Sequence, residues 1–167
     1  FVSSPIITED MDMLTVLADV LDGIGFVRTN GNKQVFWSPF PPPGSWQNQI
    51  GNWNNIDGYY FNNTTGTEVL SMTGQLVDPT TTIDLPLGYV FLGYLPWGEM
   101  DALEAFADLL PDIEFIRTNG NKQIFFSPFP PPGQWQNQIG NCKPGEGYYV
   151  KVNNAVEDFV YPALPSS

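Results

Sequence analysis

The sequence predicts an α+β fold made of two tandem copies of a small unit, each with one helix packed on a short, mainly antiparallel β-sheet. Three observations lead to this expectation: a long internal repeat, a helical spacing of apolar residues near the start of each copy, and a hairpin signal in the middle of each copy. The chain has 167 residues, of which 42% are hydrophobic, which is enough for two small cores.

The internal repeat is long and nearly identical. Residues 28–52 return at residues 117–141 with 22 of 25 positions the same, an offset of 89 residues. The same offset continues without gaps on both sides, and it pairs Gly58 with Gly147. Each copy is therefore expected to be a complete folding unit.

The repeat divides the chain into two units and a connection. We expect the first unit at residues 1–75, a Pro- and Thr-rich linker at residues 76–87, and the second unit at residues 88–167. Pro79 and Pro86 restrict the backbone of the linker, so it should be semi-rigid.

Each copy is expected to begin with a strand, at residues 1–7 and 89–95, and to continue with a helix. The helix is predicted because apolar residues recur every three or four positions on one face. These residues are Met11, Leu14, Leu17, Ala18 and Leu21 in the first copy and Met100, Leu103, Phe106, Ala107 and Leu110 in the second. Acidic residues stand in the first turn, where the helix dipole favours negative charge.

A β-hairpin is the clearest local prediction. Apolar residues alternate on both sides of the Asn119–Asn121 turn, which contains Asn-Gly. The Pro-rich segment at residues 127–133 cannot donate ladder hydrogen bonds and should form an exposed, extended loop. A closing hairpin is expected from strands at residues 147–152 and 156–161.

The charge and composition exclude several classes of function. The net charge is −12 because only six Lys and Arg oppose eighteen Asp and Glu, which argues against nucleic acid as a partner. No apolar run approaches the roughly 20 residues of a membrane-spanning helix, so membrane insertion is not expected. Histidine is absent, which removes the commonest general base and metal ligand. We therefore predict no catalytic residue, no metal, no cofactor and no enzymatic activity.

Two kinds of acidic site were weighed against a plain surface role. Asp57 with Glu68, and Glu146 with Glu157, recur in both copies and could form glycosidase-like carboxylate pairs, but turns and exposed strand positions explain them better. The acids of residues 9–12 and 99–101 could bind calcium. Helix-dipole complementarity is the simpler explanation, because no Asp-x-Asp-x-Asp-Gly loop is present.

A glycan site is predicted where an aromatic residue stands beside amides. Its residues are Trp46, Gln47 and Asn48 in the first copy and Trp135, Gln136 and Asn137 in the second. A flat apolar ring and side-chain amides suit the faces and hydroxyls of sugars, and Trp37, Tyr60, Phe126 and Tyr149 could extend the surface. The alternative, which the sequence favours, is that each Trp packs on the neighbouring prolines and covers a thin core.

Other motifs carry weaker expectations. Asn62 and Asn63 fit the N-glycosylation pattern, and the linker residues Thr80, Thr81 and Thr82 resemble an O-glycosylated segment. The Pro-rich loop could be a ligand for an aromatic groove, although a stiff loop is the simpler interpretation. Cys142 is expected to be a partly buried thiol, with an intermolecular disulfide as the alternative.

The order of these features resembles a tandem repeat of secreted and cell-surface bacterial proteins, of the fibre and adhesin type. The resemblance is carried by the opening strand at residues 86–96, the Asn137–Gly140 segment, the Pro144–Tyr148 segment (Pro-Gly-x-Gly-Tyr) and the closing strand Phe159–Pro162. The family has Gly-Trp-Asn at the opening strand, where this chain has Gly-Tyr-Val. The resemblance implies a module of long extracellular bacterial proteins and brings no catalytic residue.

Two functions are expected from these observations. The first is a structural subunit of an extracellular filament or surface stalk, whose partners are copies of itself joined head to tail. It is suggested by the tandem units and by the first copy, which lacks a counterpart of residues 83–88 and should therefore have an open strand edge. The alternative is a carbohydrate-binding or adhesive module, with glycans as partners.

Overall fold

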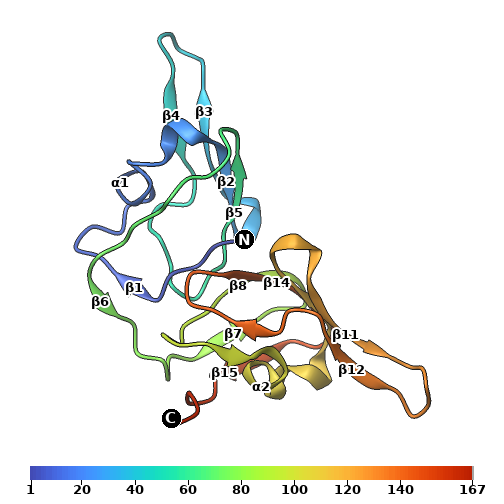
Figure 1. Ribbon diagram of the computed structural model, residues 1–167. Helices are drawn as coiled ribbons and strands as arrows, with labels where there is room; N and C mark the ends of the chain where they lie inside the picture. Colours follow the sequence, from blue (N-terminus) through green and yellow to red (C-terminus); the bar gives the residue numbers. More distant parts are fainter. Residues whose placement is uncertain (167) are drawn as a thin grey trace.

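The computed structural model describes residues 1–166 and shows a protein made mostly of β-structure (Figure 1). Strands contain 39% of the chain and helices 14%, in five antiparallel sheets. The expected α+β class, with one helix packed on a sheet in each copy, is therefore wrong. No helix in residues 1–166 has both the length and the apolar character needed to cross a membrane.

The two largest sheets have the same strand order. The first sheet is β4-β3-β2-β5, and the second is β12-β11-β10-β14 with one further strand, β8, beside β14. The strands of the first are β2 (Ile24–Arg28), β3 (Gln34–Ser38), β4 (Ser45–Asn48) and β5 (Tyr60–Asn63). Those of the second are β8 (Gly88–Gly93), β10 (Ile113–Arg117), β11 (Gln123–Ser127), β12 (Gln134–Asn137) and β14 (Gly147–Val152). The predicted central hairpin is confirmed as β10–β11, with the same pairing in β2–β3.

Three small sheets join more distant segments. They pair β1 (Ile6–Ile7) with β6 (Gln75–Leu76), β7 (Ile83–Leu85) with β15 (Val156–Phe159), and β9 (Met100–Asp101) with β13 (Asn141–Cys142). The closing hairpin expected from residues 147–161 is wrong, because β15 pairs with β7. Both edges of β14 are already occupied, by β10 and by β8.

The helices are much shorter than expected. α1 (Met13–Val16) and α2 (Ala102–Ala105) have four residues each and are followed by the 3₁₀ turns Leu21–Gly23 and Ala107–Asp112. The apolar spacing correctly marked buried positions such as Leu17, but separate short turns place such residues inward as well as one continuous helix does.

Each main sheet covers a hydrophobic core with one of its faces. The first core includes Met13, Leu17, Val27, Val35, Trp53 and Tyr59. The second includes Leu92, Phe106, Leu109, Ile116, Ile124 and Tyr148. In the segment expected as a linker, Ile83 and Leu85 of β7 are buried in the second core.

The two halves interlock through strand ends. Val2 forms β-bridges with Tyr59 of its own half and with Glu146 of the second half. Leu92 of β8 pairs with Tyr148 of its own half and forms a β-bridge with Asp57 of the first half. The backbones approach closely at glycines: a Cβ at Gly58 would stand 2.8 Å from the Leu92 carbonyl oxygen, and one at Gly147 would stand 2.6 Å from that of Val2. The contact of Val2 with the second half and the contact of Leu92 with the first half therefore have the same geometry.

Two equivalent asparagines clamp this junction. The Asn30 side chain accepts a hydrogen bond from the Phe91 backbone N–H (2.7 Å) and donates to the Phe91 carbonyl oxygen (2.8 Å). The Asn119 side chain makes the equivalent pair of hydrogen bonds to Phe1: it accepts from the terminal amino group and donates to the Phe1 carbonyl oxygen. These two bonds are exposed to solvent. The N-terminus consequently lies between the two halves, while the β3–β4 and β11–β12 hairpins project away in different directions (Figure 1).

We predict that Asn30→Ala lowers the free energy of unfolding by about 1–3 kcal/mol, because the half-buried Phe91 N–H loses its partner. Asn119→Ala, the matched control at the exposed clamp, should cost less, about 0.5–1.5 kcal/mol. Urea unfolding followed by circular dichroism measures both, and equal losses would contradict the proposed role of the junction.

Candidate functional site

The residues of the predicted glycan site do not lie on one surface. Trp46 is the cross-strand partner of Trp37, and Asn48 that of Val35, so both are on the core side of the first sheet. Gln47 is the partner of Phe36 on the opposite side. The second copy divides in the same way, with Trp135 and Asn137 on the core side and Gln136 opposite Phe125.

The tryptophans and asparagines of that site have structural roles. Trp46 and Trp135 are partly buried against the two cores. Asn48 donates to the Gly51 carbonyl oxygen (2.9 Å) and to the capping carboxylate of Asp12 (3.2 Å). Asn137 makes the equivalent bonds to Gly140 and Asp101. Their amides are thus already used within the loop.

The side of the sheets that faces away from the cores carries aromatic residues. Val27 and Val35 are buried cross-strand partners, and the alternating pair Phe26 and Phe36 therefore projects from the opposite side. We call this surface the aromatic face. It consists of Phe1, Phe26, Phe36 and Tyr60 in the first half and of Tyr89, Phe91, Phe115, Phe125 and Tyr149 in the second.

The aromatic face is continuous across the junction of the two halves. Phe1 lies between them, with its ring centre 5.5 Å from that of Tyr60 and 5.9 Å from that of Tyr149. Tyr149 in turn stacks on Tyr89, with 5.2 Å between ring centres and 9° between planes. Tyr89 is 58% exposed and Tyr60 is 39% exposed, so the surface is open to solvent.

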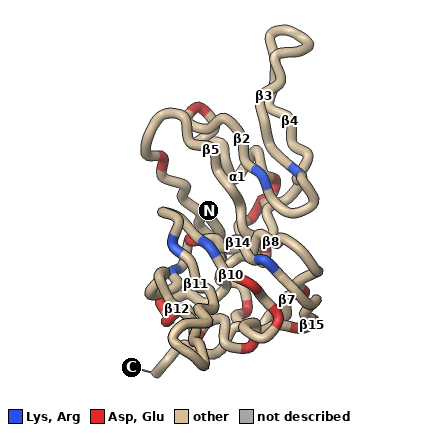
Figure 2. The backbone as a smooth tube through the Cα atoms, turned by 90° about the vertical axis from the view of Figure 1, so that its right-hand side faces the viewer, with Lys and Arg blue, Asp and Glu red and all other residues tan. Residues whose placement is uncertain are grey.

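Three of the six basic residues lie on this face. Arg28 is 5.2 Å from the ring centre of Phe26, Arg117 is 4.8 Å from that of Phe115, and Lys151 is 4.4 Å from that of Tyr89. None of the three forms an ion pair with a carboxylate in the described part of the chain. Figure 2 shows the basic residues near the middle of the molecule, whereas the β3–β4 arm carries no charge.

The aromatic face is not among the predicted sites, although the sequence contains a signal for it. Segments such as Phe26-Val-Arg28, Phe115-Ile-Arg117 and Tyr149-Val-Lys151 alternate two kinds of residue, aromatic or basic on one side and aliphatic on the other. A strand that is solvated on one side normally shows polar residues there. Aromatic residues at those positions indicate a surface with a role beyond solvation.

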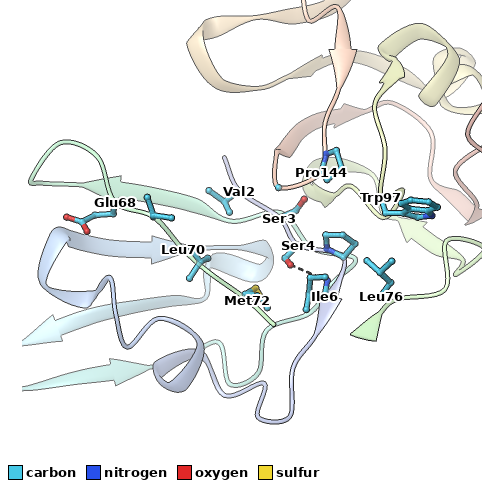
Figure 3. Close-up of a pocket in the computed structure, with 13 residues that line it drawn as sticks. Val2, Ser3, Ser4, Ile6, Glu68, Leu70, Met72, Leu76, Trp97 and Pro144 are labelled. Carbon is cyan, nitrogen blue, oxygen red and sulfur yellow. Dashed lines mark hydrogen bonds between the residues drawn. The ribbon is translucent and has the colours of Figure 1, made fainter. Parts of the chain in front are cut away.

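An apolar groove of about 570 Å³ lies on another part of the molecule, between the start of the chain and residues 68–72 (Figure 3). It is lined mainly by aliphatic side chains together with Trp97, which is 63% exposed. Its one charged residue, Glu68, stands at the far end (Figure 3). The groove therefore offers no converging acid, base or nucleophile.

Three acidic residues of the candidate carboxylate and calcium sites, Asp12, Asp57 and Asp101, have structural partners. Asp12 and Asp101 cap α1 and α2, accepting from the backbone N–H groups of Leu14 and Leu103 (2.9 Å each). Asp57 lies at the junction, where burial raises the pKa of its carboxyl and Asn30 donates to it (2.8 Å). Among residues 1–166, no group of three or more metal-ligating side chains could hold an ion.

The candidate glycosylation residues lie in two different settings. Asn62 is half-buried in β5 on the side of the aromatic face, opposite Phe26, whereas Asn63 is exposed at the strand end. Thr80 and Thr82 are exposed and Thr81 is half-buried, in a turn where Thr80 and Thr81 hydrogen-bond to Asp78.

With this geometry established, the chain was compared with protein-family models, with curated proteins and with solved structures, and none of the three comparisons found a match. The resemblance to the bacterial surface repeat therefore stays a prediction.

Cys142 is fully buried in the second core, beside Tyr148. The thiol is thus more deeply buried than the partly buried thiol that the sequence predicts, and it lies in β13, where Cys142 pairs with the buried Met100 of β9. Burial raises the pKa of the thiol from 9.0 to about 12. The thiol is accordingly protonated and unavailable at neutral pH.

We predict that Cys142 resists iodoacetamide in the native protein at pH 8 and reacts once urea unfolds it. Because the folded-state pKa lies above the unfolded value, its contribution to stability is complete below pH 9 and is lost as the pH rises towards 12. The free energy of unfolding should thus fall between pH 9 and 10 by less in Cys142→Ala than in the wild type. Parallel pH profiles would contradict this assignment.

Proposed function

We propose that the protein is an extracellular carbohydrate-binding or adhesive module of a bacterial surface protein, and that the aromatic face is its binding surface. The observation that carries the proposal is the continuous row of exposed and half-exposed rings across both halves. An apolar surface of this kind on a folded domain marks an interaction site.

The chemistry of the face suits sugars. The flat apolar side of a pyranose ring can stack on an exposed aromatic ring, while its hydroxyls need hydrogen-bond donors and acceptors at the edge. Gln47 is the cross-strand partner of Phe36, and Gln136 is that of Phe125. In each half, the aromatic residues are therefore followed across the sheet by a side-chain amide, which can donate and accept hydrogen bonds. The two glutamines are thus retained from the predicted site, on a different surface.

The junction makes one long surface out of two short ones. Because Phe1 contacts rings of both halves, a chain of sugars could contact both sheets at once. Binding to both halves by one ligand raises the affinity above that of either half alone.

We predict that Tyr149→Ala weakens glycan binding about tenfold, or roughly 1.4 kcal/mol, because it removes the ring at the centre of the face. Trp97→Ala is the matched control, since it removes an exposed aromatic residue elsewhere and should leave binding within about twofold. A glycan array followed by isothermal titration measures both. Equal effects, or binding lost only in Trp46→Ala and Trp135→Ala, would count against the aromatic face.

A second function, self-assembly into a filament or surface stalk, is favoured by one specific observation. In the second sheet, β8 covers the edge of β14 along six residues. In the first sheet, Tyr60–Asn63 of β5 pairs only with β2 within the described residues. An edge of this kind can accept a strand from another copy.

If copies associate through this edge, a peptide of residues 86–93, which covers the equivalent edge in the second half, should compete with them. We expect light scattering to show association that grows with protein concentration and that the peptide reverses. A peptide of the same composition in scrambled order is the control. A monomer at every concentration, with no filaments in electron micrographs, would exclude this second function.

A further inference from the structure

The two halves of the aromatic face differ in charge. In the second half, Lys151 lies over Tyr89 and Arg117 lies over Phe115, around the ring of Tyr149. In the first half, the neutral residue Asn62 occupies the position of Lys151. Among the described residues, the second half therefore combines two cations with a stacked pair of tyrosines.

These cations are placed to meet a ligand. Lys151 on β14 and Arg117 on β10 are diagonal neighbours on the same side of the sheet, since Phe115 is the cross-strand partner of Lys151 and Tyr149 is that of Arg117. Both act on the Tyr149 hydroxyl, where their charge opposes the rise in pKa that burial causes. In a chain of net charge −12, two adjacent cations without a carboxylate partner in the described residues form a local positive site.

We propose that this cluster of Tyr89, Arg117, Tyr149 and Lys151, the cationic subsite, binds a uronic acid residue within an otherwise neutral glycan. The inference rests on the proposed glycan-binding function and adds the class of sugar. The sugar ring would stack on the tyrosines, and its carboxylate would accept charge-assisted hydrogen bonds from Arg117 or Lys151. The first half of the aromatic face, where Arg28 is the one basic residue among those described, would bind the neutral sugars next to the uronic acid in the same glycan.

A polyanion such as single-stranded nucleic acid fits this surface less well. Aromatic rings and cations also serve such ligands, but each nucleotide brings a phosphate, and binding several of them requires a track of basic residues. The aromatic face has three cations, and eighteen acidic residues elsewhere in the chain would repel a long polyanion.

The test compares glucuronoxylan with its carboxyl-reduced form, which has the same backbone without the charge. By isothermal titration, the wild type should bind glucuronoxylan about tenfold more tightly, and the preference should decline as salt is added. Lys151→Asn, which installs the residue of the first half, and Arg117→Gln should each remove most of this preference. Arg28→Gln, the matched control in the first half, should leave it within about twofold.

The outcomes separate the two proposals. Equal binding of both polysaccharides, unaffected by the variants, would overturn the cationic subsite and leave the glycan-binding function standing. No binding to these or to any neutral glycan of an array would overturn both. Tighter binding of dextran sulfate or of an oligothymidylate than of glucuronoxylan would replace the uronic acid with a sulfated or nucleic-acid ligand. Circular dichroism confirms that each variant is folded.

Discussion

The architecture depends on the close backbone contact between the two halves. Val2 and Leu92 each bridge a strand of their own half and a loop of the other half, at points where only glycine leaves room for the approaching carbonyl. Because the Val2 and Leu92 contacts are equivalent, together they fix both the distance and the relative orientation of the two sheets. The aromatic face is a consequence of this constraint, because a different orientation would separate Phe1 from Tyr149.

The two halves differ at one edge of their sheets. Among the described residues, β8 pairs with β14 along six residues, whereas β5 pairs only with β2. In the described residues, the second half has the wider outward surface, with Tyr89 and Lys151 on it. Ligand binding and self-association are thus proposed for different parts of the same arrangement.

The sequence allowed the repeat, the central hairpins and many buried positions to be predicted, because these depend on local patterns. Asn119-Gly120 with flanking alternation specifies a hairpin wherever it lies in the fold. The helices were overestimated since the spacing of Leu14, Leu17 and Leu21 fits short turns as well as a continuous helix. The pairing of β15 with β7 and the continuity of the aromatic face across the junction depend on contacts between distant segments, which local patterns do not contain.

The central claim is that ligands bind to the outward aromatic rings and not to the tryptophans on the core side. Nuclear magnetic resonance of the aromatic side chains during titration with glucuronoxylan oligosaccharides tests it most directly. The ring signals of Tyr60, Tyr89 and Tyr149 should shift while the indole signals of Trp46 and Trp135 stay in place. Shifts confined to the two indoles would contradict it.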